Sequence, residues 1–231
     1  MLIIVSGEIV KICYDSYDRQ ATIESLKELV ERRQIMGEGE DAAEYLFQYL
    51  RNLLGEFVRA KRGGGHGGTI EVCEVGYNMG HSSLIWLMED GGIRVRAFDI
   101  GEHEYSLPAS RHLEERFGSG RFGITFGDSL ETVPHFASLV SAGLEDPCHV
   151  VFVDGGHTPA VARSDIASFG AAVDPGGHLL IVDDTNQGGV GDVWRDMQEE
   201  GIVAEAGAVY EDVFYKDVDS SRSSISYGVY L

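Results

Sequence analysis

The sequence predicts an α/β fold in which helices cover both faces of a mostly parallel sheet. Beyond a glycine-rich stretch at residues 61–68, short apolar runs alternate with helical segments, which is the pattern of parallel strands joined by crossover helices. The length of 231 residues suits one sizeable core with a modest appendage. The end of the chain changes to two β-rich segments, which predicts an antiparallel hairpin at the sheet edge.

Residues 1–68 are expected to form an N-terminal helical extension or cap, and residues 69–231 the main domain. Residues 22–36 carry apolar side chains at helical spacing. A stronger helix is predicted over residues 43–58, where leucine and phenylalanine residues form a broad apolar stripe. This stripe also makes a homodimer reasonable. The following sequence KRGGGHGG has the composition of a flexible connection, so we place the domain boundary there.

Five strands are predicted in the main domain from short apolar runs. They cover Thr69–Val75, Val95–Asp99, Gly123–Phe126, His149–Asp154 and His178–Asp183. The helices between them are expected to begin near Ser82, Leu107, Leu130 and Thr158. Thr158 and Pro159 form a good start signal, with threonine as N-cap and proline at the first helical position. The C-terminal hairpin is expected to pair Val209–Lys216 with Ser224–Leu231 across a polar turn at residues 217–222.

Composition and charge exclude several classes of partner. With 43% hydrophobic and 24% charged residues, the chain has the composition of an ordinary soluble globular protein. Its formal net charge of −20 would repel nucleic-acid phosphates and anionic membrane surfaces, so we expect neither as a partner. The opening MLIIV is too short for a membrane span and has no basic stretch before it, so we also expect no signal peptide.

The three cysteines, Cys13, Cys73 and Cys148, are too few and too scattered for a disulfide framework or a zinc site. Cys73 and Cys148 lie in apolar runs. They are therefore expected to be buried, reduced thiols of a cytoplasmic protein.

The loop after the first predicted strand is the strongest candidate for a ligand site. Residues 74–82 read EVGYNMGHS, and two glycines four residues apart allow a tight turn and a close ligand approach before a helix begins. In open α/β sheets, ligands bind beyond the carboxyl ends of the strands. A nicotinamide or flavin protein would normally carry G-x-G-x-x-G here. The middle glycine is missing, and Glu74 suits a positively charged amino acid or sulfonium better than a pyrophosphate.

The pattern E-x-G-x-x-x-G, followed by Asp99 at the end of the second strand, resembles motif I and the ribose-binding acid of class I S-adenosylmethionine (SAM)-dependent methyltransferases. The resemblance covers roughly residues 69–194 well and the C-terminal hairpin moderately. It implies a Rossmann-like sheet of seven strands that binds SAM. Ser82 would hold the methionine carboxylate, Asp99 the ribose hydroxyls, and Asp128 with Ser129 would flank the adenine. The complete set of expected cofactor-binding residues is Glu74, Gly76, Asn78, Gly80, Ser82, Asp99, Gly127, Asp128 and Ser129.

Two further strand ends carry carboxylates: Asp154 after the fourth strand, and Asp183 with Asp184 after the fifth. Neighbouring strands lie about 4.8 Å apart, so these three side chains are expected to share a small volume. Such a cluster repels itself unless it is protonated or bridged by a cation. Oxygen ligands suit Mg²⁺, with Mn²⁺ or Ca²⁺ as alternatives.

This second arrangement resembles the divalent-metal-dependent O-methyltransferases of the catechol and caffeoyl-coenzyme A type. The resemblance implies that Asp154, Asp183 and Asp184 bind the ion. Those enzymes have a catalytic lysine three residues after the first ligand, where this sequence has His157, so Asp154 and His157 are the expected catalytic residues. The metal would lower the pKa of a substrate hydroxyl, and a histidine that titrates near neutrality could take its proton.

The leading hypothesis is therefore an O-methyltransferase that acts on a small hydroxylated metabolite with Mg²⁺. The carboxylates could instead contact substrate amines or cap helices in a metal-independent methyltransferase with an N, O or C acceptor. Asn186 could replace one ligand, and His157 could merely orient the helix that follows it. A nicotinamide-dependent oxidoreductase and a non-catalytic SAM-binding protein are the alternatives from other classes.

Overall fold

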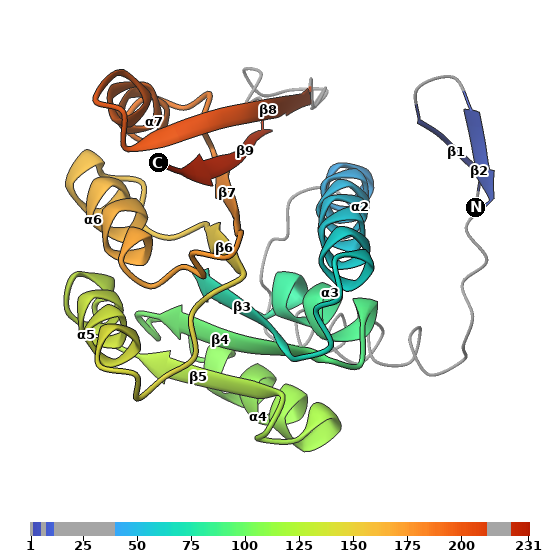
Figure 1. Cartoon of the computed structure of the whole chain (residues 1–231), viewed down its shortest axis with the longest axis horizontal. Helices are drawn as coiled ribbons and strands as arrows, with labels where there is room; N and C mark the ends of the chain where they lie inside the picture. The colour runs from blue at the N-terminus through green and yellow to red at the C-terminus, as the bar shows by residue number, and fades with distance from the viewer. Residues whose placement is uncertain (1, 6–7, 12–39, 212–222) are drawn as a thin grey trace. The chain divides into compact units, whose positions relative to one another are not determined.

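The computed structural model describes residues 2–5, 8–11, 40–211 and 223–231, and it divides into two compact units, residues 1–36 and 37–231. In the first unit, β1 (Leu2–Val5) and β2 (Glu8–Lys11) form an antiparallel pair (Figure 1). A hairpin therefore begins the segment that we expected to be helical, because Ile3, Ile4 and Val5 are β-branched residues that favour strands. The helix expected over residues 22–36 lies outside the described residues.

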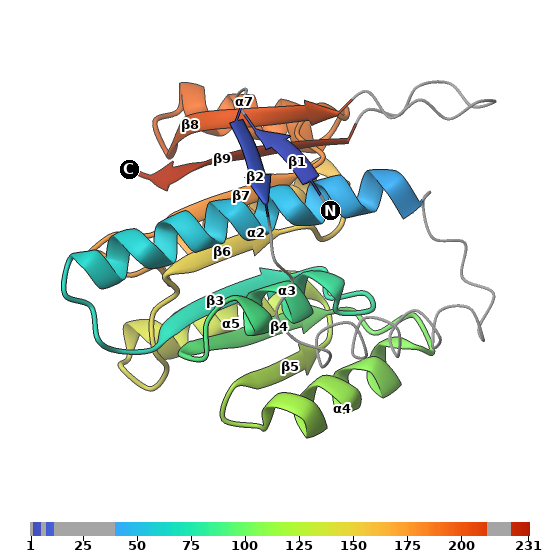
Figure 2. The same cartoon turned by 90° about the vertical axis from the view of Figure 1, so that its right-hand side faces the viewer.

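The second unit begins with the long helix α2 (Glu40–Gly63), which contains the helix predicted over residues 43–58. Its residues Leu50, Leu54 and Val58 are buried within the unit. These three residues of the apolar stripe are thus used inside the chain, and the expected homodimer stays a prediction. The structural division falls before α2 and not after residue 68, because α2 packs beside α3 (His81–Glu89) on one face of the sheet (Figures 1 and 2).

Seven strands form one sheet with the order β5-β4-β3-β6-β7-β9-β8. The first five strands in this order form four parallel pairs, and β9 is antiparallel to both β7 and β8. This arrangement confirms the predicted mostly parallel sheet with a C-terminal antiparallel hairpin. The strands are β3 (Ile70–Val75), β4 (Ile93–Asp99), β5 (Phe122–Phe126), β6 (Val150–Val153), β7 (Leu179–Asp183), β8 (Val203–Glu211) and β9 (Ser223–Tyr230).

Helices cover both faces of the sheet, as predicted. Figure 1 shows α2 and α3 on one side and α5, α6 and α7 on the other. Thr158 caps α6 by accepting a hydrogen bond from the backbone N–H of Val161, as its sequence position predicted. The remaining helices are α4 (Ser106–Phe117), α5 (Ser129–Ser141), α6 (Pro159–Gly170) and α7 (Val190–Glu199).

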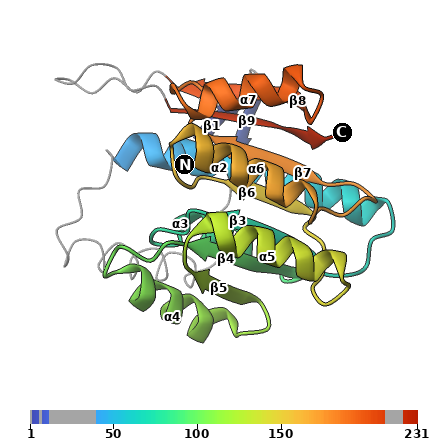
Figure 3. The ribbon, with the colours of Figure 1, turned by 90° about the vertical axis from the view of Figure 1, so that its left-hand side faces the viewer.

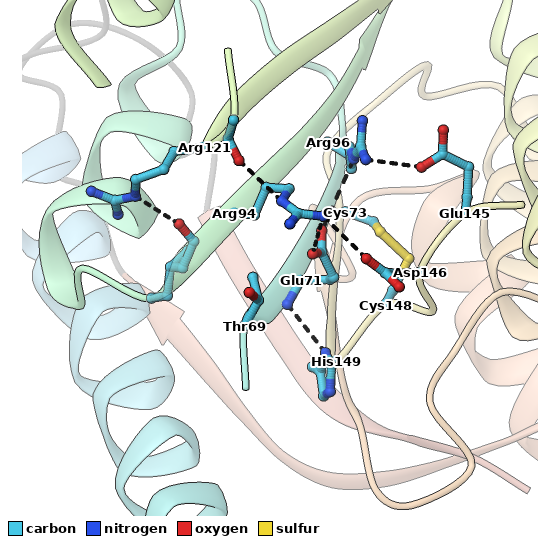
Figure 4. A network of polar contacts seen from close by, with 12 residues as sticks. Thr69, Glu71, Cys73, Arg94, Arg96, Arg121, Glu145, Asp146, Cys148 and His149 are labelled. Atoms are coloured by element: carbon cyan, nitrogen blue, oxygen red, sulfur yellow. Dashed lines mark hydrogen bonds and ion pairs between the residues drawn. A yellow bond between two sulfur atoms is a disulfide. The ribbon is translucent and has the colours of Figure 1, made fainter. Parts of the chain in front are cut away.

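The expectation of two reduced thiols is wrong, because Cys73 and Cys148 form a disulfide (Figure 4). Both cysteines are fully buried. They are 75 residues apart in the sequence, but their Cα atoms lie 5.8 Å apart because β3 and β6 are neighbours in the sheet. The expected cytoplasmic location thereby loses its argument from reduced cysteines. In the part of the chain that the structure describes, no helix is long and apolar enough to cross a bilayer.

Charged side chains surround the disulfide and tie the segment before β6 to the start of β3 and β4 (Figure 4). Arg94 lies 2.8 Å from the buried carboxylate of Glu71 and 3.1 Å from that of Asp146. The backbone N–H of Glu71 also donates to Nδ1 of His149. Burial raises the pKa of Glu71 to about 7, although the neighbouring arginines oppose the shift. The disulfide is therefore one of several links at this place.

Candidate active site

The winding of the sheet reverses between β3 and β6, and in open α/β sheets the ligand crevice lies at such a point, beyond the carboxyl ends of the strands. The loop after β3 enters it with positive φ angles at Gly76 (94°) and Gly80 (81°). A Cβ atom at Gly76 would lie 1.8 Å from the carbonyl oxygen of Asp154. The loop expected to bind the cofactor therefore touches the loop that begins with Asp154, and the two candidate sites are adjacent.

Glu74 lies beneath the glycine loop and is fully buried. Its carboxylate accepts hydrogen bonds from the hydroxyls of Ser82 (3.0 Å) and Ser83 (3.1 Å) and from Nε1 of Trp86 (2.7 Å). In this structure Glu74 thus binds the first turns of α3. Glu74 and Ser82, the two side chains that we expected to bind SAM, are thus hydrogen-bonded to each other. Their direct roles in cofactor binding stay predictions.

Burial raises the pKa of Glu74 to about 7, although its three donors oppose the shift. Between its unfolded pKa of 4.5 and about 7, the native state binds more protons than the unfolded state. The contribution of Glu74 to the free energy of unfolding is therefore fully present below pH 4.5 and is lost as the pH rises through 7. We expect Glu74→Gln to lose less stability than the wild type between pH 5.5 and pH 8.

Urea unfolding at the two pH values measures this difference. The comparison of variant with wild type cancels the opposite contribution of His149, whose pKa burial lowers. The pKa of Glu71 is also raised to about 7, so part of the decrease in the free energy of unfolding with pH remains in both proteins. Equal slopes for the wild type and Glu74→Gln would contradict the prediction.

Asp99 joins the loops after β3 and β4. Its Oδ2 accepts from the backbone N–H of Asn78 and its Oδ1 from that of Gly101, both at 2.7 Å. Asn78 has a positive φ of 50° and accepts a hydrogen bond from the hydroxyl of Tyr105. Asp99 therefore lies at the rim of the crevice, where its predicted partner, the ribose, would be next to the glycine loop.

The loop after β5 carries the residues predicted for the adenine. Gly127 has a φ of 146°, and Asp128 caps α5 by accepting from the backbone N–H of Leu130. Three large apolar residues are exposed here: Ile100 by 64%, Leu130 by 42% and Phe126 by 37%. We did not single them out in the sequence, although an apolar residue directly after a strand-end acid, as Ile100 is after Asp99, is a usable signal. Exposed apolar side chains beside polar atoms suit a flat aromatic base.

On the opposite side of the crevice, ligand atoms of Asp154, His157 and Asp184 all lie within 4.8 Å of one another. Nε2 of His157 is 3.0 Å from Oδ2 of Asp184. Gln187 donates to the other oxygen of Asp184, whose backbone has a positive φ of 58°. Burial raises the pKa of Asp184, and His157 opposes the shift. Two carboxylates and an imidazole at this separation are a donor set that fits a divalent cation.

Asp183 is not a member of this group among the described residues. Its Oδ1 accepts a hydrogen bond from the backbone N–H of Asp184. Asp183 ends β7 and Asp184 follows it, and consecutive side chains near a strand end point to different sides. The structure therefore brings His157, and not Asp183, together with Asp154 and Asp184. The possible substitute Asn186 donates its backbone N–H to the hydroxyl of Ser224.

Comparisons with known proteins agree with these motifs. Residues 73–185 match the sequence profile of a family described as "Methyltransferase domain". No curated protein matches the sequence significantly.

Several solved structures share the fold. The O-methyltransferase TomG from Streptomyces achromogenes, involved in tomaymycin synthesis and solved with SAM, is 13% identical, with a TM-score of 0.63 over 95% of this chain and 92% of that chain. A Klebsiella pneumoniae protein described as an O-methyltransferase is 14% identical, with a TM-score of 0.62 over 94% and 92%. A Staphylococcus aureus protein described as a caffeoyl-CoA O-methyltransferase is 13% identical, with a TM-score of 0.58 over 89% and 91%. At such identities, the likeness shows the fold alone.

Proposed function

We propose that this protein, whose residues 73–185 match the profile of a methyltransferase domain, is a SAM-dependent methyltransferase that transfers the methyl group to a hydroxyl of a small metabolite with the help of a divalent cation. The observation that carries the proposal is the group formed by Asp154, His157 and Asp184. Its place supports the proposal too, because the backbone of Asp154 touches Gly76 of the glycine loop. A cofactor held by that loop would present its methyl group beside these side chains.

The residues of the group divide into two roles. Asp154 and Asp184 would hold the cation, which would lower the pKa of the acceptor hydroxyl and orient it. His157 would accept the hydroxyl proton of the substrate, a role supported by its 61% exposed side chain and by the contact of its Nε2 with Asp184. Asp184 would then stabilise the protonated imidazole. Holding acceptor and cofactor in line is the other contribution that the protein makes.

The choice of cation depends on how His157 acts. If His157 acts as a base, the cation has only the carboxylate oxygens of Asp154 and Asp184 as protein ligands, and oxygen ligands suit the Mg²⁺ that we propose. As a ligand, its imidazole would favour Mn²⁺ or another transition metal. A metal-independent methyltransferase remains the second candidate, because the contact between His157 and Asp184 also forms a base and its orienting acid without an ion.

Chelation is the test of the metal. We expect EDTA to abolish the release of S-adenosylhomocysteine (SAH) with a panel of catechols and other hydroxylated aromatic compounds, and Mg²⁺ to restore it. Asp184→Asn should lose the calorimetric signal of Mg²⁺ binding but keep its affinity for SAH, because Asp184 lies on the acceptor side. His157→Gln should lose activity and keep Mg²⁺ affinity if His157 is the base. Turnover that survives full chelation would show that the reaction needs no metal ion.

Cofactor binding is tested separately by thermal shift with SAM, SAH and NAD. A ligand at about 100 times its Kd stabilises a protein by about 2.7 kcal/mol, which a thermal shift detects readily. Stabilisation by NAD and not by SAH would overturn the proposed function.

A further inference from the structure

Tyr105 lies outside the expected set of cofactor-binding residues, but its hydroxyl reaches the glycine loop. It directly precedes α4, the helix that follows the loop after β4 and packs beside the edge strand β5 (Figure 3). Tyr105 is only 8% exposed, and the ring of His103 lies parallel to its ring, with 4.8 Å between the two centroids. Burial and stacking therefore limit the orientations that the phenol ring can take.

Asn78, the residue that the Tyr105 hydroxyl contacts, lies in the middle of the glycine loop and has an unusual backbone conformation. Its φ of 50° is in the left-handed region, which asparagine tolerates better than most residues but does not prefer. Asn78 is exposed, so packing does not explain this conformation. Two hydrogen bonds act on it instead: its backbone N–H donates to Asp99 at 2.7 Å, and its side-chain Oδ1 accepts from Tyr105 at 2.6 Å.

These contacts form a chain from the start of α4 to the rim of the crevice. Tyr105 holds the side chain of Asn78, and the backbone N–H of Asn78 holds Oδ2 of Asp99. The other carboxylate oxygen of Asp99 accepts from Gly101 in the loop after β4. The chain thus joins the loops after β3 and β4, between which the cofactor is expected. A change at Tyr105 should therefore be felt by the cofactor through Asn78.

We propose that Tyr105 is a positioning residue for the cofactor: its hydroxyl holds Asn78 in the left-handed conformation and so keeps the glycine loop and Asp99 in the arrangement that binds SAM. A loop that is ordered before the ligand arrives loses less binding free energy to ordering. Without the hydroxyl, the loop populates other conformations, and the affinity falls with the fraction of molecules that keep the competent one. The inference rests on the proposed function, because it takes SAM as the ligand of this crevice.

The test is Tyr105→Phe, which removes the hydroxyl and keeps the buried ring. Calorimetry on the full chain should show a loss of SAH affinity of about fivefold. This corresponds to about 1 kcal/mol, the usual net contribution of one hydrogen bond.

Tyr230→Phe is the matched control. The Tyr230 hydroxyl donates to the carbonyl oxygen of Ile166 at 2.7 Å, so the same substitution removes a hydrogen bond of the same kind. Tyr230 ends β9 and its backbone N–H donates to His178, directly before β7, which is the end of the sheet opposite to the crevice. Tyr230→Phe should lower the melting temperature and keep the SAH affinity of the wild type.

A substitution at Asn78 separates positioning through this residue from any other effect of Tyr105. Glycine adopts a positive φ readily, so Asn78→Gly no longer needs the hydroxyl to hold the loop. In the Asn78→Gly background, Tyr105→Phe should therefore cause no further loss of SAH affinity. If Asn78→Gly binds SAH too weakly, the same four proteins are compared by urea unfolding. The two substitutions should then be less than additive, because they remove one shared hydrogen bond.

Several outcomes would overturn the inference. They are wild-type SAH affinity in Tyr105→Phe, an equal loss in Tyr230→Phe, and the same fivefold loss with and without the side chain of Asn78. Additive effects of the two substitutions on the free energy of unfolding would overturn it as well. Failure of the wild type to bind SAH would overturn the proposed function instead.

Discussion

Gly76→Ala is expected to lose SAH binding and methyl transfer together while the protein stays folded. The new Cβ atom would lie 1.8 Å from the carbonyl oxygen and 2.4 Å from the carbonyl carbon of Asp154, so one of the two backbones must move. A residue with a Cβ atom is also strained at the φ of 94°, which costs about 1–3 kcal/mol of stability. Either displacement changes the contact between the cofactor loop and the loop that carries Asp154 and His157. We expect at least a tenfold loss of SAH affinity and a larger loss of turnover, since a misplacement of about 1 Å can cost 100-fold in rate.

Gly91→Ala is the matched control for this substitution. Gly91 lies in the turn before β4, its added Cβ would meet no atom within 4 Å, and its φ is not in the left-handed region. Calorimetry with SAH and circular dichroism melting should therefore give wild-type values for Gly91→Ala. Gly80→Ala should also be damaging, because its Cβ would lie 2.5 Å from ring atoms of the buried Tyr77 and alanine is disfavoured at the φ of 81°. Gly76→Ala with wild-type SAH affinity would contradict the assignment of the loop.

Much of this fold follows from local sequence patterns. The inner parallel strands β6 (Val150–Val153) and β7 (Leu179–Asp183) are buried on both faces and read as almost continuous apolar runs, so their positions could be predicted within a few residues. Asp99, Asp128 and Asp154 lie at or just after strand ends. Because all these ends meet at one edge of a parallel sheet, the sequence also predicts that they share a crevice.

Features that depend on which side chains meet across the sheet could not be predicted in the same way. The phase of the chain at the end of β7 decides whether Asp183 or Asp184 faces Asp154, and the sequence Asp183-Asp184 is compatible with either. Glu74 has three donors from the first turns of α3, but a sequence with an acid before a glycine loop does not show what the acid contacts. The same reason applies to Tyr105, whose partner Asn78 comes from the loop after β3.

The disulfide is the clearest example, because its two cysteines lie 75 residues apart in the sequence. Its removal in Cys73→Ala/Cys148→Ala is expected to lower the free energy of unfolding by about 2–4 kcal/mol. A crosslink over so many residues restricts the unfolded chain strongly, and its loss raises the entropy of the unfolded state. For a chain of this size, the melting temperature should fall by roughly 5–15 °C.

Reduction of the disulfide in the wild-type protein is the control for the double substitution. Dithiothreitol should lower the urea midpoint of the wild type toward that of the double variant and leave the double variant unchanged. Thiol titration of the denatured, unreduced wild type should find one reactive cysteine, Cys13, of the three in the sequence. Three reactive thiols would contradict the disulfide.

The double variant should nevertheless keep its affinity for SAH. Arg94 still joins the carboxylates of Glu71 and Asp146 without the disulfide, and the Glu71 backbone still donates to His149. These contacts hold the segment before β6 against β3 at the end of the strands opposite to the crevice. The crevice itself is held by Glu74, Asp99 and the contact between Gly76 and Asp154, none of which includes a cysteine. Loss of the crosslink should therefore act on stability alone, and an equal loss of SAH affinity would show that the disulfide also shapes the site.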